Sequence, residues 1–306
     1  MSVGSERLKN LANLWRRKRP EVGATPHDVV WAENKWRLLR YRSVGVPLTG
    51  EPLLLIPSLI NRHYVLDLMA GKSFTEWMLE QGRPIYTIDW GTPGPEDRYL
   101  TFDDICDGYI GRALRKTREA AGTNRVHVLG YCMGGTLATI HAAAHPGSMA
   151  SLIALAAPVS FNDGGMLSDW VRTDGFDLGA TLKAYGNMPA QLMQASFHLL
   201  RPTLTLSKAM HVIDRAWNDP FLDGFLAIET WSNDNVSFPG ECYRRYITDL
   251  YQADQLVRGE FTLSGRPARL ANITCPTLVI TFADDSIVPL ASAQPLVDQV
   301  GAKDVT

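Results

Sequence analysis

Residues 126–138, VHVLGYCMGGTLA, constrain the fold more than any other stretch of the chain. An apolar run ends at Gly130-Tyr131-Cys132-Met133-Gly134-Gly135, and small residues follow directly. This order predicts a strand, a sharp turn and a helix over 136–145. The turn would hold the Cys132 sulfur above the end of a sheet. Free N–H groups and the helix dipole there favour a thiolate.

The two glycines that flank Cys132 have a steric reason to be there. A side chain at Gly130 or Gly134 would collide with the neighbouring strand or helix. The Gly-x-nucleophile-x-Gly form is the nucleophile elbow of α/β hydrolases, with cysteine in place of serine. The alternative is a core cysteine in a β–α turn, because cysteine is often a small buried residue. The position of the motif, between a strand-like run and a helix, favours the nucleophile.

The bulk properties exclude several classes of protein. A length of 306 residues suits one large α/β domain, alone or with an insertion. A formal charge of −2 is near neutral and does not suggest nucleic acid as a partner. The four cysteines, Cys106, Cys132, Cys242 and Cys275, lie far apart, which argues against a disulfide framework or a zinc site and favours the cytoplasm. No apolar run has the length of a membrane span.

The N-terminal segment has one local pattern. Leu8, Leu11 and Trp15 share a helical face, and the basic run 16–19 follows. An amphipathic helix that touches a lipid-like surface is one interpretation. A solvated first helix with a charged end is the other, and we favour it.

The remaining pattern of strands and helices predicts an α/β fold with a mostly parallel, doubly wound sheet. The dense apolar run 51–56, EPLLLI, suits a central strand covered on both faces. Ser73, with Glu76 three residues later, predicts the start of a helix over 73–81. The other predicted elements are helices over 29–35 and 101–122 and strands over 36–41, 84–89, 126–129, 151–157 and 276–282.

The segment 159–274 contains no clear buried strand and is rich in Met, Trp, Phe and Leu at helical spacing. We interpret it as a mainly helical cap, which would exclude water from the reacting centre. The predicted division is therefore a hydrolase core over 1–158 with a short N-terminal segment 1–35, the cap over 159–274, and a return to the core over 275–306.

The plan of the hydrolase fold nominates further site residues. Its oxyanion hole is formed by the N–H after the nucleophile and by one from the loop after an earlier strand. These are Met133 and, within the loop 58–64, Ile60. The acid follows a strand beyond the nucleophile, so Asp284 and Asp285 are both candidates. We predict no metal ligand.

The base of such a triad is missing from its expected place. A thiol nucleophile needs a group that takes its proton, and histidine titrates near neutral pH. All seven histidines precede Asp285, and residues 302–306 look like the start of one more strand, after which the histidine should follow. Either the chain is truncated, with the histidine beyond Thr306, or His63 takes its place. We favour truncation and expect little turnover from the polypeptide as written.

Several motifs together resemble the polyhydroxyalkanoate synthases, and most closely the class III type. They are the cysteine box 130–135, the segment 61–68 (NRHYVLDL), Asp89-Trp90-Gly91 followed by 100–104 (LTFDD), Thr274-Cys275-Pro276, and 285–289 (DSIVP). The resemblance implies that Asp285, not Asp284, is the acid. The family's Gly-His segment after this acid has no counterpart here, which is the one large departure.

The resemblance also implies a reaction. (R)-3-Hydroxyacyl-coenzyme A, such as the 3-hydroxybutyryl thioester, would acylate Cys132, and the hydroxyl of the next unit would attack the bound chain. Coenzyme A is then the leaving group, and no cofactor is expected. A homodimer or an accessory synthase subunit is the expected partner, with the polyester as product. Two alternatives stay open: a cysteine-dependent thioesterase or depolymerase, and an inactive homologue that binds granules or a partner subunit.

Overall fold

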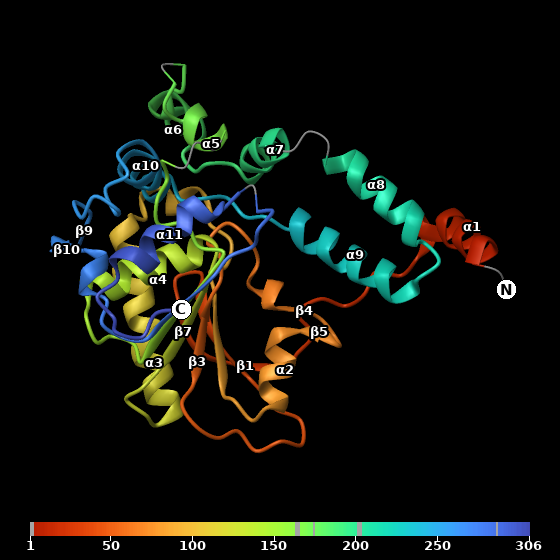
Figure 1. Cartoon of the computed structure of the whole chain (residues 1–306), viewed down its shortest axis with the longest axis horizontal. Coiled ribbons are helices and arrows are strands. Elements are labelled where there is room, and N and C mark those ends of the chain that lie inside the picture. The colour runs from red at the N-terminus through yellow and green to blue at the C-terminus, as the bar shows by residue number, and fades with distance from the viewer. Residues whose placement is uncertain (1–2, 163–165, 174, 201–203, 286) are drawn as a thin grey trace.

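The architecture is a seven-stranded sheet between layers of helices (Figure 1). The structure is a computed structural model that describes residues 3–162, 166–173, 175–200, 204–285 and 287–306. In spatial order the strands are β1 (His27–Glu33), β2 (Trp36–Tyr41), β6 (Ile85–Asp89), β3 (Leu53–Ile56), β7 (His127–Tyr131), β8 (Ser151–Leu155) and β11 (Thr277–Ile280). The pairs from β6 to β11 are parallel, and β1 and β2 are antiparallel.

Alternate residues of the central strand β3 face the two helical layers. Leu54 and Ile56 join the larger core, which also contains residues of α3 (Ile110–Ala121) and α4 (Met133–Ala144). Leu53 and Leu55 point the other way, into a smaller core with residues of α2 (Phe74–Glu80). All four residues of β3 are buried, as expected for a parallel strand with both faces covered. The predicted α/β class is therefore confirmed.

The helix predicted over 29–35 is wrong. Residues 29–33 belong to β1, which pairs with β2 in a hairpin with Glu33 opposite Trp36, and residues 34 and 35 form the turn. Asn34 takes a left-handed conformation, with φ of 51°, at the turn. The paired β-branched residues Val29 and Val30 suit a strand better than a helix. The hairpin could not be recognised from the sequence because its two-residue turn is Asn34-Lys35, whereas the usual signal of such a turn is Asn followed by glycine.

Local signals located two helices correctly. The Ser73 hydroxyl accepts a hydrogen bond from the Glu76 N–H at 2.9 Å, and α2 begins at the next residue. The helix predicted over 101–122 is present as η4 (Asp104–Tyr109), which has π-helical geometry, followed by α3. Gly122, with φ of 66°, ends α3 in the left-handed conformation that favours glycine.

The chain between β8 and β11 covers the carboxyl ends of the strands and then extends sideways (Figure 1). No described residue of this segment joins the main sheet. Its elements are α5 (Met166–Trp170), α6 (Leu178–Tyr185), α7 (Ala190–Leu200), α8 (Leu204–Arg215), α9 (Asp219–Asn233), α10 (Gly240–Arg245), η5 (Tyr246–Gln252), the small hairpin β9 (Thr262–Leu263) and β10 (Arg266–Pro267), and η6 (Leu270–Asn272).

The N-terminal helix α1 (Val3–Asn13) and the turn η1 (Leu14–Arg16) lie against the extension made by α8 and α9 (Figure 1). Arg17 forms ion pairs with Asp219 and Asp223 of α9 at 2.7 and 2.8 Å. Leu8 and Trp15 are 72% and 96% exposed, so these two residues of the apolar face identified in the sequence are not covered by this contact, whereas Leu11 is partly buried.

The last residues run parallel to β11. The Thr277 N–H donates to Asp304 O at 3.0 Å, and the Val279 N–H donates to Thr306 O at 2.7 Å. This confirms the strand start predicted near the end of the sequence. The remaining elements are η2 (His63–Leu66), β4 (Asp67–Met69), β5 (Lys72–Ser73), η3 (Pro95–Tyr99) and α11 (Leu290–Gln299). None of the helices described is both long and apolar enough to cross a membrane.

Candidate active site

Cys132 occupies a strained turn between β7 and α4. Its backbone has φ of 53° and ψ of −128°, a region that non-glycine residues rarely adopt. The strain is held by hydrogen bonds on both sides. The Cys132 N–H donates to Leu155 O at 2.9 Å, and Cys132 O accepts from the Gly135 N–H at 2.8 Å. The sheet and the helix thus fix the cysteine in the geometry of a nucleophile elbow.

The flanking glycines are sterically required, as the sequence predicted. A Cβ at Gly130 would lie 2.7 Å from the Gly135 nitrogen, inside the helix that follows. A Cβ at Gly134 would overlap the carbonyl oxygens of Ile56 and Pro57. The loop after β3 therefore packs directly on the first turn of α4, which brings that loop beside Cys132.

A mostly apolar cavity of about 80 Å³ lies over Cys132. The elbow and the loop after β3 form its floor, and the segment between β8 and β11 forms its roof with aromatic and methionine side chains. The lining residues are Ser58, Ile60, Cys132, Met133, Pro158, Leu167, Trp170, Met188, Met193, Ser196, Phe238, Tyr243, Tyr246, Ile247, Tyr251, Ile287 and Val288. A sulfur facing such a cavity can be acylated by a substrate while most water is excluded.

The electrostatics of Cys132 differ from the sequence-based expectation of a thiolate. Burial raises the pKa of the Cys132 thiol to about 11. A hydrogen bond from the Met133 N–H lowers this pKa, as expected at a helix N-terminus, and the Asp285 carboxylate raises it. Desolvation therefore outweighs the helix terminus, and near pH 7 the cysteine is a thiol that needs a base.

Asp285 lies in the loop after β11, at the edge of the same cavity. Its Oδ1 accepts hydrogen bonds from the N–H groups of Ile287 and Val288 at 2.8 and 3.0 Å. Both of these residues line the cavity, whereas Asp284 is exposed. Within the motif 285–289, Ser286 lies outside the described residues. The structure thus brings Asp285 close enough for its charge to act on Cys132.

None of the described histidine side chains lines the cavity. His63, the stand-in considered from the sequence, lies in η2 and faces Asp89, with 3.4 Å between Nδ1 and Oδ1. Burial raises the pKa of Asp89. Hydrogen bonds with His63 and Arg37 lower this pKa by more than burial raises it, so the pKa of Asp89 lies below its usual range. His63 is therefore part of a separate charged cluster and does not face the sulfur.

The other histidines considered from the sequence lie on β7 or near the end of α4. His127 contacts Ser151 and Glu51, at 2.7 and 2.9 Å. His141 is buried, and this burial lowers its pKa to about 4. His127 and His141 have hydrogen-bond partners of their own and do not line the cavity over Cys132.

The two residues predicted for the oxyanion hole, Met133 and Ile60, both line the cavity. The Met133 N–H points at the sulfur closely enough to lower its pKa. The loop that carries Ile60 is held at both ends. Pro57 O accepts a hydrogen bond from the Trp90 indole at 2.9 Å, and Ile60 O accepts one from the Val236 N–H at 3.0 Å.

The sequence-based interpretation missed Ser58, which precedes Ile60 by two residues. Its side chain is 1% exposed and lines the cavity, and its hydroxyl has no hydrogen-bond partner among the described residues. A buried hydroxyl without a partner is unfavourable unless a ligand completes it. The available signal was a single polar residue directly after the apolar strand and Pro57.

Comparison with known families agrees with this geometry. Residues 51–303 match the α/β hydrolase fold family, and residues 19–78 match the N-terminus of poly-beta-hydroxybutyrate polymerase (PhaC). An α/β hydrolase fold protein from Nakamurella multipartita is a similar solved structure, with a TM-score of 0.50, 19% identity and coverage of 92% of this chain and 89% of that one. The fold and the elbow define an α/β hydrolase-type protein.

Curated relatives narrow the class further. The poly(3-hydroxyalkanoate) polymerase subunit PhaC of Allochromatium vinosum is 34% identical, over 97% of this chain and 84% of the relative. The subunits of the same name from Haloferax mediterranei and Haloarcula marismortui are 33% and 31% identical over 99% of this chain. This chain spans 61% and 64% of the length of those two relatives. The chain belongs to the PhaC family of poly(3-hydroxyalkanoate) polymerase subunits.

Proposed function

We propose that this chain carries the acyl-transfer centre of a polyester synthase, with Cys132 as nucleophile and Asp285 as the triad acid. The donor would be a short-chain (R)-3-hydroxyacyl-coenzyme A, such as the 3-hydroxybutyryl thioester. The observation that carries the proposal is the Cys132 sulfur at the floor of a roofed apolar cavity in a chain of the PhaC family.

The chemistry suits a cysteine. A base takes the thiol proton, the Cys132 sulfur attacks the thioester carbonyl, and coenzyme A leaves as a thiol with that proton. Because one thioester replaces another, the acyl group stays activated for the next step. The hydroxyl of the second unit then gives its proton to the base and attacks the enzyme-bound carbonyl, which forms the new ester and releases the Cys132 thiol. The aromatic roof would keep water from taking the place of that hydroxyl.

The tetrahedral intermediate of each step carries a negative oxygen. The N–H groups of Met133 and Ile60 are our candidates for stabilising it. A donor of this kind contributes ~3 kcal/mol to the transition state in enzymes where it has been removed. Ser58 is a candidate third donor, because its buried hydroxyl lines the same cavity and lacks a partner among the described residues.

The proposed reaction needs a base. The raised pKa of Cys132 makes one necessary, and the described histidines lie elsewhere. We propose a histidine in the loop after the strand that begins at 304–306. Parallel neighbours bring their carboxyl ends to the same edge of a sheet, so a loop after that strand would emerge next to Asp285. Asp285 would then orient the imidazole and stabilise its charged form.

Two other functions predict different products. A thioesterase or depolymerase would share the same nucleophile and acid but would pass the acyl group to water. An inactive homologue would bind polymer granules or a partner subunit without turnover, and the absence of a histidine from the described cavity lining favours it for the polypeptide as written. A homodimer or an accessory synthase subunit is our expectation for the assembly, and the exposed Leu8 and Trp15 are candidate contacts for a granule.

The test is incubation with (R)-3-hydroxybutyryl-coenzyme A. Two polypeptides are compared: the chain ending at Thr306, and one extended by the downstream coding sequence. Free thiol, insoluble polyester and free 3-hydroxybutyrate are measured together. We expect polymer and thiol from the extended chain, little of either from the shorter one, and neither from Cys132→Ala. Free acid in place of polymer would identify a hydrolase, and an inactive extended chain would overturn the catalytic assignment.

A further inference from the structure

The end of helix α9 holds the loop after β3, which carries Ile60. We call residues 231–236, the last three residues of α9 and the three that follow, the α9 junction. The Val236 N–H donates to Ile60 O at 3.0 Å, whereas the N–H of Ile60 donates to no acceptor among the described residues. Only the two dihedral angles of Ile60 lie between its N–H and this fixed carbonyl. The α9 junction therefore limits the directions in which the Ile60 N–H can point.

Asp234 supplies a charged contact between the α9 junction and this loop. Its Oδ1 accepts a hydrogen bond from Nε of Arg62 at 3.0 Å, and its Oδ2 accepts one from the Tyr64 hydroxyl at 2.7 Å. Hydrogen bonds to a charged carboxylate are about twice as strong as those between neutral groups. Arg62 is also bonded to the Thr92 hydroxyl at 2.9 Å, and its carbonyl oxygen accepts from the Trp231 indole at 3.1 Å. One carboxylate thus fixes two side chains of the loop.

The place of Asp234 is not explained by α9 itself. Asp234 is the C-terminal capping residue of this helix. The helix dipole puts partial negative charge at that end, so a carboxylate there is unfavourable. The contacts with Arg62 and Tyr64 offset this cost. Burial and the hydrogen bond to Asp234 both raise the pKa of Tyr64, so its hydroxyl keeps its proton and stays a donor. Asp234 therefore serves a contact outside its own helix.

We propose that Asp234 is a positioning residue for acyl transfer. It fixes Arg62 and Tyr64, keeps loop 58–64 on the floor of the cavity, and so holds the Ile60 N–H where the negative oxygen of the tetrahedral intermediate forms. This role rests on the proposed function, in which the Ile60 N–H is one of the oxyanion donors. Asp234 does not line the cavity over Cys132, so it acts through the loop and not on the substrate.

The size of the effect follows from how strongly such sites depend on geometry. A displacement of about 1 Å, caused by a change away from the reacting atoms, can slow a reaction about 100-fold. The bond from Val236 to Ile60 remains when Asp234 is replaced, so we expect a loss of about tenfold to 100-fold. Global stability should change little, because Asp234 is 42% exposed and ion pairs of this kind contribute little to it.

The experiment compares variants of the chain extended by the downstream coding sequence. Asp234→Ala removes both acceptor oxygens, Asp234→Asn keeps one of them, and Tyr64→Phe removes one donor. The values of kcat and KM are measured with (R)-3-hydroxybutyryl-coenzyme A. Hydrogen exchange of the peptide that covers loop 58–64 is measured by mass spectrometry, which reports the anchoring of the loop without any turnover.

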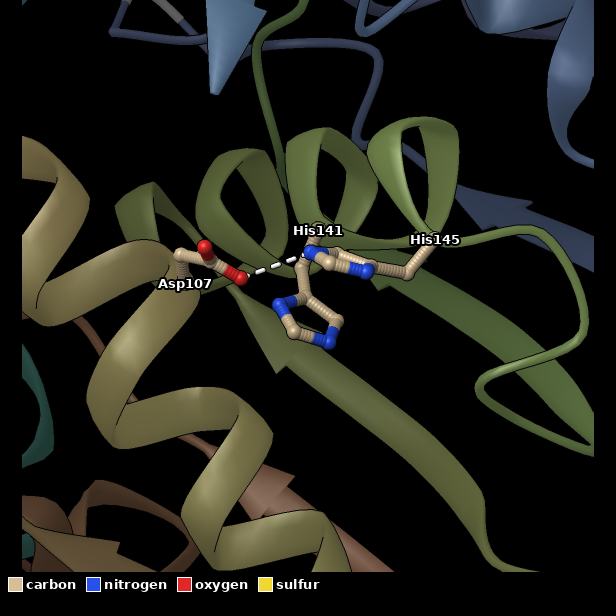
Figure 2. Close-up of side chains that lie close together, drawn as sticks. All are labelled: Asp107, His141 and His145. Carbon is tan, nitrogen blue, oxygen red and sulfur yellow. Dashed lines mark hydrogen bonds and ion pairs between the residues drawn. The ribbon is translucent and has the colours of Figure 1, made fainter. Parts of the chain in front are cut away.

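Two controls break ion pairs of the same kind elsewhere. Asp223 of α9 pairs with Arg17 at 2.8 Å, and its side chain is 35% exposed, against 42% for Asp234. Asp107 of η4 pairs with His145, the residue that follows α4, with 2.6 Å between Oδ1 and Nε2 (Figure 2). Asp223→Ala therefore tests a loss of charge on α9, and Asp107→Ala tests a general loosening around the helix that follows the nucleophile.

We expect Asp234→Ala to lower kcat about tenfold or more, to change KM less than about twofold, and to speed exchange of loop 58–64. Asp234→Asn and Tyr64→Phe should fall between Asp234→Ala and the wild-type chain, and both controls should match the wild-type chain in both measurements.

Unchanged exchange of loop 58–64 in Asp234→Ala would overturn the proposal. So would faster exchange without a fall in kcat, a rise in KM at unchanged kcat, or an equal loss in either control. An extended wild-type chain without turnover would count against the proposed function alone, and exchange of the loop would then decide the anchoring by itself.

Discussion

The reactivity of Cys132 gives the sharpest test of the site. Its thiol lies in an apolar cavity, and burial raises its pKa to about 11. The perturbation is pH, applied to the chain ending at Thr306. The readout is the rate at which iodoacetamide alkylates each cysteine, measured by mass spectrometry of the digested protein. Because only the thiolate reacts, the rate reports the fraction of Cys132 that is ionised.

The magnitude follows from the difference in pKa. A free cysteine has a pKa near 8.5, so a shift to about 11 leaves about 300-fold less thiolate at any pH well below both values. The alkylation rate of folded Cys132 should therefore rise about tenfold for each pH unit between 7 and 10. The alkylation rate of an unfolded cysteine levels off within this pH range. The sign follows from the cause: a low-dielectric cavity disfavours the charged form, and an acid then holds its proton to higher pH.

The reference is the alkylation rate of the same Cys132 peptide in protein unfolded with urea. Because the same cysteine is compared with itself, differences in intrinsic reactivity between cysteines do not enter. Restricted access to the cavity would lower the alkylation rate by the same factor at every pH. The midpoint of the curve of rate against pH therefore reports the pKa of Cys132 independently of access. A midpoint for folded Cys132 at or below that of the unfolded reference would refute the reasoning. It would mean that the helix N-terminus, and not desolvation, controls the thiol.

Three further outcomes are expected. Asp285→Asn should lower the alkylation midpoint of Cys132, because the carboxylate raises the pKa of that thiol. If Asp285 is the triad acid, the same change should abolish polymer formation by the extended chain. An unchanged midpoint would contradict the placement of Asp285 near Cys132. Gly134→Ala should lower the free energy of unfolding in urea by about 3 kcal/mol, because its Cβ would overlap backbone carbonyls, whereas Gly175→Ala, with open space around it, should cost far less. Ser58→Ala should leave stability unchanged or raise it by about 1 kcal/mol, because it removes a buried hydroxyl without a partner, while it slows acylation of Cys132 by the thioester; a loss of stability would show that the hydroxyl is bonded in the protein.

Patterns confined to neighbouring residues could be predicted. The run EPLLLI became the buried strand β3, and Ser73 with Glu76 became the N-terminal cap of α2. The helix predicted over 29–35 was wrong because the structure of this segment depends on another segment of the chain. Its strand depends on pairing with β2 across the turn at Asn34, and that pairing is a contact between segments which periodicity within one segment does not reveal.

The candidate site divides in the same way. Gly130, Cys132 and Gly134 are adjacent in the chain, so the elbow and its steric demands could be inferred from spacing alone. Chain order nominated Asp284 and Asp285 equally as the acid, and only the resemblance to the synthases selected Asp285. Ser58 could not be singled out, because a serine after a strand is ordinary until the packing shows that its hydroxyl is buried, unpartnered within the described residues, and on the cavity wall.

The linear order of residues determined by itself the α/β class and the strained turn at Cys132, and it nominated the sulfur nucleophile, since each inference depends on a few neighbours and on backbone sterics. Only the tertiary structure decided the state of that sulfur. Its charge depends on how much water remains around it, and walls from distant parts of the chain exclude that water. The contact between Asp234 and loop 58–64 is also a product of folding, because Asp234 and its partner Arg62 are 172 residues apart in the chain.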